Sequence, residues 1–159
     1  MPGIVSIKKF GPWAAFLAVP RKARKVLHQA VESTVNKQAQ SLGDQIKRTI
    51  QSGGAGGPAL SPITRAKKGH GTKLVDSNEL ASSIEVTPAQ TNGQDGFVGI
   101  PKGRGHRGGL SLEQLAAIHE FGTARIPARP FIGPTLKKFV PKLQKSVIKV
   151  WDKSVKGLM

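Results

Sequence analysis

Two adjacent ionisable residues in the C-terminal third of the chain, His119 and Glu120, are the pair whose types could support chemistry. A histidine followed by a glutamate on a helix is the first half of a zinc-protease motif. That motif needs a second histidine four residues after the first, and position 123 is threonine. As a general acid and base, the two side chains would leave a helix about 100° apart and would not converge on one substrate atom. We therefore expect no catalysis here, and the chain is not predicted to be an enzyme.

Metal and cofactor sites are not indicated by the rest of the sequence. The four histidines, at positions 28, 70, 106 and 119, lack the spacing of metal ligands, and the 159-residue chain contains no cysteine. Two glycine-rich segments, 53–58 and 103–109, lack the Gly-Lys-Ser/Thr ending of a nucleotide-binding loop. We expect neither a metal nor a cofactor.

Positive charge is the dominant bulk property of the chain. Twenty-five Lys and Arg residues against nine Asp and Glu give a formal net charge of +16. We expect such a chain to bind polyanions in a salt-dependent way. The net charge therefore indicates a class of partner but not a function. The second glycine-rich loop resembles arginine–glycine tracts that contact nucleic-acid backbones, yet it has no aromatic residues for stacking on bases. Its candidate DNA-backbone contacts are Lys102, Arg104 and Arg107, and the alternative is a solvated loop.

The first element that positions these residues is a long helix. From Pro20 onward, apolar residues recur every three or four positions until Ser52 and the glycines after it end the pattern. Residues 53–73 then predict a flexible loop of about twenty residues, a length that is usually functional or ordered by a partner. The expected inward face of the helix comprises Val26, Leu27, Ala30, Val31, Val35, Ala39, Leu42, Ile46 and Ile50.

A small β-sheet is expected after this loop. Asp76 or Ser77 is the predicted cap of a short helical turn. Alternating apolar and polar residues then predict strands at 83–87 and 96–100. The Asn-Gly pair at 92–93 favours a tight reversal, and hence antiparallel pairing of the two strands.

Two further helices complete the predicted domain, which spans residues 20–159. Ser111 opens a capping-box outline for a helix that ends at Gly122. The segment from Pro134 carries an apolar stripe with lysines on the other side, and Pro141 should kink or restart its helix. The expected fold class is α+β, with a long N-terminal helix, a small mainly antiparallel β-sheet with a short helix, and a C-terminal helix packed on one face.

Residues 1–19 are expected to form an N-terminal arm outside this domain. Their apolar run has the outline of a secretory signal, but Pro12 interrupts it. Basic residues follow Pro20 where a small-residue cleavage site is required. No other stretch approaches the roughly 18 apolar residues of a membrane span, and no membrane partner is expected. The arm is either an apolar docking segment or a segment folded on the chain's own core.

The segment between the last two predicted helices contains a recognisable sequence motif. It reads His-Glu-Phe-Gly-Thr at 119–123 and Ile-Pro-Ala-Arg-Pro-Phe at 126–131, and an upstream string runs from Leu-Ser-Pro at 60–62 to Leu-Val-Asp-Ser-Asn-Glu-Leu at 74–80. Together they resemble the signature of small tail-completion, or head–tail joining, proteins of long-tailed bacteriophages, also called virion morphogenesis or minor tail proteins. Family members commonly carry threonine and glycine where Ser77 and Asn78 stand, and asparagine tolerates the positive φ that glycine would supply.

The resemblance implies a structural virion protein that assembles with itself into a ring, expected to be a hexamer, at the head–tail junction or the top of the tail. The implied partners are neighbouring neck and tail proteins such as the head-closure and tail-terminator proteins. The implied location is the virion neck or tail, with the host cytoplasm as the place of assembly. Expected subunit or partner contacts are His119, Glu120, Phe121, Gly122, Arg125, Pro127, Arg129, Pro130 and Phe131. The loop expected to bridge subunits contributes Leu60, Pro62, Arg65, Lys67, Lys68, Leu74 and Asp76.

Specific residue roles accompany this hypothesis. Glu120 is expected to pair with Arg125 or Arg129 and so fix the turn after its helix. Replacing Phe131 and Arg129 with alanine is predicted to leave the protein folded but to block the production of joined particles. The alternative hypothesis, motivated by charge alone, is a basic nucleic-acid-binding protein that acts outside the virion. It predicts tight DNA binding by the isolated monomer, with a steep loss as salt rises.

Overall fold

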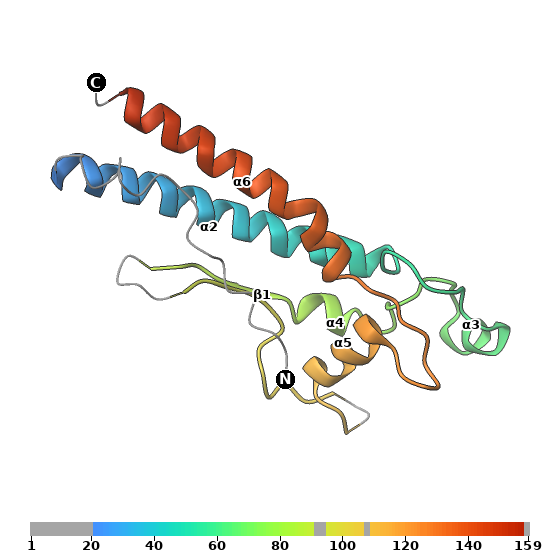
Figure 1. Ribbon diagram of the computed structural model, residues 1–159. Helices are drawn as coiled ribbons and strands as arrows, with labels where there is room; N and C mark the ends of the chain where they lie inside the picture. The colour runs from blue at the N-terminus through green and yellow to red at the C-terminus, as the bar shows by residue number, and fades with distance from the viewer. Residues whose placement is uncertain (1–20, 91–94, 107–108, 158–159) are drawn as a thin grey trace.

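Two long helices run side by side through the protein in the computed structural model, which describes residues 21–90, 95–106 and 109–157 (Figure 1). Helix α2 spans Arg21–Gln51 and helix α6 spans Gly133–Lys156. The C-terminal end of α6 lies beside the start of α2, so the pair is antiparallel (Figure 1). The predicted N-terminal arm, the reversal at 92–93 and Arg107 lie outside the described residues.

The remaining elements lie on the side of α2 away from α6 and at its C-terminal end (Figure 1). They are α3 (Pro62–Lys68), α4 (Glu79–Ser82), β1 (Glu85–Thr87), β2 (Phe97–Gly99) and α5 (Leu112–Phe121). β1 and β2 pair antiparallel, with Val86 opposite Val98. The predicted α+β class, the long first helix, the antiparallel strand pair and the C-terminal helix are confirmed.

The hydrophobic core lies where the C-terminal half of α2 meets α4, α5 and the segment that enters α6. Apolar side chains from all these elements are excluded from solvent there, which is the main favourable term in folding. Partly buried residues such as Leu42 and Ile132 extend the cluster. Its buried members are Ile46, Ile50, Leu80, Ala81, Ile84, Ala116 and Phe131.

The sheet is attached to the middle of α2 by two specific contacts. The Asn36 side-chain amide donates to the carbonyl of Ala89 at 3.0 Å, and its oxygen accepts from the Ala89 N–H at 2.9 Å. Two turns farther on, a β-carbon at Gly43 would lie 2.5 Å from Cγ2 of Val86, so only glycine allows this close approach. The hairpin is therefore held on one face of α2.

Two local predictions are wrong. Val26 is 59% exposed, because it lies about 100° around the helix from the buried Leu27. Neither Asp76 nor Ser77 is the N-cap of α4, since that position is Asn78 and makes no side-chain cap bond. Of the two outcomes predicted at Pro141, a kink or a restart, the restart does not occur, because α6 continues through Pro141. This proline lies on the exposed side, where water can solvate the carbonyl that lacks an N–H partner.

The predicted tolerance of Asn78 for a left-handed backbone is confirmed, since its φ is 59°. Glycine or asparagine adopts this conformation at lower cost than most residues. The chain therefore turns into α4 at the position where the resembling sequences commonly carry glycine.

The segment 53–73, predicted to be a flexible loop, contains helix α3 and folds back on its own chain. Ser61 caps α3 by accepting a hydrogen bond from the Thr64 N–H at 3.2 Å, and Gly69 ends it with a left-handed φ of 72°. The Lys73 ammonium closes the segment by donating to the carbonyls of Gly56 and Gly57 at 3.0 and 3.1 Å. The prediction overlooked the Ser-Pro pair at 61–62, which is an N-cap followed by proline at the first helical position.

Candidate functional site

Helix α5 is defined at both ends by its own sequence. The Ser111 hydroxyl accepts from the Gln114 N–H at 3.3 Å, and the Gln114 side chain accepts from the Ser111 N–H at 3.0 Å, which completes the predicted capping box. At the other end Gly122 has φ 74° and ψ 179°, a region that only glycine adopts readily. A β-carbon there would also lie 2.8 Å from the Ala128 nitrogen.

The chain after α5 forms a closed turn, residues 122–129. The Thr123 N–H donates to the Ile126 carbonyl at 2.8 Å, and the Thr123 hydroxyl accepts from the Ile126 N–H at 3.0 Å. The Arg129 N–H then returns to the carbonyl of His119 at 2.6 Å. These bonds hold the 122–129 turn against the end of α5.

Glu120 does not pair with Arg125 or Arg129, so that prediction is wrong. Its carboxylate instead accepts the backbone N–H groups of Phe131, Ile132 and Gly133 at 2.8, 2.9 and 2.8 Å. Ile132 is the N-cap residue of α6 and has no side-chain oxygen to perform this task. Glu120 therefore caps α6 from another helix, and its negative charge lies at the positive end of the helix dipole.

The predicted contact residues divide into exposed and internal sets. Phe121 is 81% exposed, and Arg125 and Pro127 are also exposed. Phe131 is 0% exposed and belongs to the core, so its side chain is not a surface contact of the folded chain. The half-buried Pro130 accepts the Ala55 N–H at 2.8 Å and so joins the glycine-rich segment to the turn.

Two exposed apolar residues are not among the contact residues predicted from the sequence. Ile126 at the tip of the 122–129 turn is 38% exposed, and Ile63 on α3 is 73% exposed. Each is a single isoleucine next to a proline, and a helical or strand period does not mark it. Together with Phe121, these two side chains expose apolar surface to water.

A pocket of about 280 Å³ lies between α3, α4, α5 and the end of the 122–129 turn. Its apolar lining comes from Leu60, Leu74, Leu80 and Leu115, and its charged lining comprises Lys68 and Arg129 as well as Asp76 and Glu79. The two sequence strings meet here, because the predicted residues Leu60, Lys68, Leu74 and Asp76 line it together with His119 and Arg129.

Two polar atoms in this pocket are buried without a hydrogen-bond partner in the described part of the chain. They are Nδ1 of His119 and Nε of Arg129. Burial, together with the positive charges of Arg129 and Lys68, lowers the pKa of His119 below its usual value. The imidazole is therefore neutral at pH 7 and is available to accept or donate one hydrogen bond.

The depressed pKa of His119 predicts a stability loss on acidification. Unfolding releases the ring to its ordinary pKa near 6.5, so the unfolded state binds more protons once the pH falls below that value, and stability decreases. Thermal melts between about pH 7.5 and pH 5.5 should show a falling Tm, and His119→Gln should show a smaller fall. Equal pH dependence of the two proteins would contradict the assignment to His119.

The remaining members of the predicted bridging loop make local contacts. Pro62 is the exposed first residue of α3, and Lys67 is exposed on the same helix. Arg65 donates through Nε to the carbonyl of the buried Leu60 at 3.2 Å. The pocket residue Lys68 also donates to the Thr72 carbonyl at 3.2 Å. These bonds order the segment within one chain.

The glycine-rich loop around position 105 is bound by carboxylates of its own chain. Arg104 forms an ion pair with Glu85 of β1, and Nδ1 of His106 lies 2.9 Å from a carboxylate oxygen of Glu79. The Gly103 N–H donates to Glu113 at 3.1 Å, which holds the pKa of that carboxyl below its usual value. Of the candidate DNA contacts, Lys102 is exposed and Arg104 is already paired.

Within 21–90, 95–106 and 109–157, no group of three or more His, Asp and Glu side chains is arranged to hold a metal ion. None of the helices in those ranges combines the length and apolar character needed to cross a bilayer. Comparison of the chain with models of known families, with curated proteins and with solved structures found no match.

Proposed function

We propose that this protein is a structural component of a tailed-bacteriophage virion, a tail-completion or neck protein that forms a ring at the head–tail junction or the top of the tail. The sequence resemblance over residues 60–134 motivates the proposal. The observation that carries it is Phe121, a large aromatic side chain 81% exposed on a rigid, capped helix. Exposed aromatic residues on ordered elements are frequent anchors of protein interfaces.

The geometry of α5 favours a ring over an isolated dimer. His119 and Leu115 of α5 line the pocket, and Phe121 leaves the helix about 160° from His119 and about 120° from Leu115. Phe121 and the pocket therefore face different directions. Contact between Phe121 of one subunit and the pocket of the next would be heterologous, and repeated head-to-tail contacts form a ring when the rotation between subunits closes.

The pocket has the composition to receive an aromatic ring. Its leucines supply an apolar lining, and Arg129 and Lys68 can place positive charge over the ring face. The exposed Ile126 and Ile63 would extend the same contact beyond the pocket. In the proposed assembly the ring, a hexamer by family expectation, contacts head-closure and tail-terminator proteins.

Replacing Phe121 with alanine should prevent assembly without unfolding the monomer. Loss of an interface anchor costs about 2 kcal/mol, roughly a 30-fold lower association constant for each contact. The gene for this protein should be inactivated in the phage or prophage that encodes it, and the wild-type protein or the Phe121→Ala variant should then be supplied from a plasmid. We expect a large fall in infectious titre with Phe121→Ala, with separate heads and tails in electron micrographs.

Phe97→Ala is the matched control, because Phe97 is 44% exposed but lies on β2, away from the pocket. It should support a normal titre. A normal titre from Phe121→Ala would refute the subunit contact. Absence of the wild-type chain from purified virions would refute the neck assignment itself, and would favour the alternative of a nucleic-acid-binding protein outside the virion.

A further inference from the structure

Six lysines form one line along the solvent side of α6. They follow one another at steps of four, three, four, four and three residues, and the mean step equals the α-helical repeat of about 3.6. All six therefore fall within an arc of about 80° around the helix, and all are exposed. This lysine stripe comprises Lys138, Lys142, Lys145, Lys149, Lys153 and Lys156.

The lysine stripe has no acidic partner among the residues that the structure describes. α6 carries seven lysines and one acidic residue, Asp152, and the ion pairs found among the described residues include no side chain of α6. Like charges three or four positions apart repel one another on a helix. Only Lys153 and Lys156 lie in the last turn, where the helix dipole favours positive charge. The repulsion between the others would be relieved by an external polyanion.

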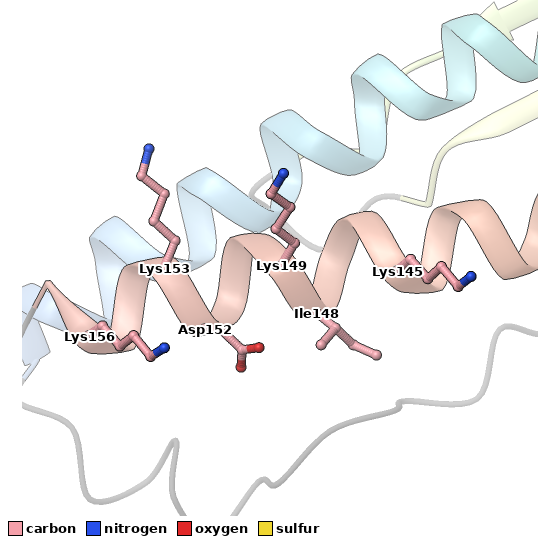
Figure 2. Close-up of a pocket in the computed structure, with 6 residues that line it drawn as sticks. All are labelled: Lys145, Ile148, Lys149, Asp152, Lys153 and Lys156. Atoms are coloured by element: carbon pink, nitrogen blue, oxygen red, sulfur yellow. The ribbon is translucent and has the colours of Figure 1, made fainter.

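Figure 2 shows the C-terminal half of the lysine stripe. A shallow hollow runs along α6 and is lined by Lys145, Lys149, Lys153 and Lys156, together with Ile148 and Asp152. Lys149 and Lys153 extend toward one side of the helix, and Lys145, Ile148, Asp152 and Lys156 extend toward the other. By the helical angle, Asp152 lies about 20° outside the arc that the six lysines occupy.

The packing of α6 against α2 fixes the helix backbone that carries the stripe. Phe139, about 80° around the helix from the middle of the stripe, is buried, and the hydroxyls of Thr135 and Thr49 lie 3.1 Å apart across the α2–α6 contact. A prearranged row of charges loses less conformational entropy on binding than charges on a flexible tail.

The length of the stripe allows contact with several phosphates of duplex DNA. From Lys138 to Lys156 the axis rises about 27 Å at about 1.5 Å per residue. Each strand carries one phosphate per roughly 3.4 Å of the duplex axis, and the lysines can reach those of either strand that lie on the side facing α6. Lysine ammonium groups neutralise phosphates as point charges and lack the planar fork that reads base edges.

We propose that the lysine stripe of α6 binds the phosphate backbone of duplex DNA without regard to base sequence. We prefer this surface to the glycine-rich loop as the main DNA contact, because Arg104 of that loop is paired with Glu85 whereas all six lysines of the stripe are exposed. The inference does not depend on ring formation. In a neck ring the stripe would contact the passing genome, and in a free protein it would serve the same purpose.

The test is DNA binding by the full-length protein as a function of salt. Fluorescence anisotropy should use two duplexes of about 30 base pairs with unrelated sequences, at about 50 to 200 mM salt. Six neutralised phosphates predict a slope of about −5 for log K against log salt, equal for both sequences. Replacing Lys145, Lys149 and Lys153 with glutamine should change the slope to about −3 and weaken binding on the order of 100-fold at about 100 mM salt.

The control removes the same net charge elsewhere. Lys37 and Arg48 are exposed on α2 and Lys67 is exposed on α3, and changing these three to glutamine should leave the slope within about 1 of the wild-type value. Arginine at positions 145, 149 and 153 should bind as the wild type does, and circular dichroism melts should show that all variants fold.

Two outcomes would overturn the proposal. Equal loss in the two glutamine triple variants would mean that binding follows net charge and not the stripe. Unchanged duplex binding by the stripe variant, combined with weaker binding to phosphatidylserine-containing vesicles, would assign the surface to an anionic membrane instead.

Discussion

Phe131→Ala should lower the free energy of unfolding by about 3–5 kcal/mol. The Phe131 side chain is 0% exposed and packs in the cluster that contains Ile46, Ile50, Leu80 and Ala116. Alanine would remove the buried ring and leave a cavity that the surrounding helices fill only in part. Total stabilities of small domains are about 5–15 kcal/mol, so this loss is a large fraction. Urea denaturation followed by circular dichroism measures it.

Phe121→Ala provides the comparison within the same sequence string. Because that ring is mostly in water already, its removal should change the free energy of unfolding by less than about 0.5 kcal/mol. Equal destabilisation by the two substitutions would show that Phe131 is not a core residue. The result also bears on the sequence-based test with Phe131 and Arg129, since the expected instability of that double variant would confound its effect on particle assembly.

Glu120→Ala should lower the free energy of unfolding by about 2–3 kcal/mol. The substitution removes an acceptor of three backbone N–H groups at the start of α6 and the charge that stabilises its dipole. Because Pro134 has no N–H, the Glu120 carboxylate accepts most of the backbone N–H groups at the start of α6 that have no partner within the helix. Denaturant titration should show a lower midpoint with an unchanged slope.

Two variants separate the cap from a general charge effect. Glu120→Gln retains an acceptor oxygen without the charge and should lose about half as much stability. Glu113→Ala removes an equal charge from the same helix together with the bond to the exposed Gly103, and should cost clearly less stability than Glu120→Ala. A loss from Glu113→Ala as large as that from Glu120→Ala would refute the capping role.

Several residues of the candidate site could be predicted from the sequence, but their contacts could not. Both sequence strings reach the pocket, through Lys68 and Asp76 from one and His119 and Arg129 from the other. The roles were not predictable, because a carboxylate followed closely by two arginines is expected to form ion pairs. The backbone amides that Glu120 binds exist as a group only after α6 is placed against α5.

Features set by neighbouring residues follow from the sequence alone. They include the helical period of α2, the Ser111–Gln114 capping box, the left-handed Asn78 and the charge of α6, because each depends on bonds or spacing within a few residues. The tertiary structure decided that Phe131 is core while Phe121 is surface, and that Glu120 caps α6. Burial and long-range hydrogen bonds depend on which elements meet in space, and no short stretch of sequence contains that information.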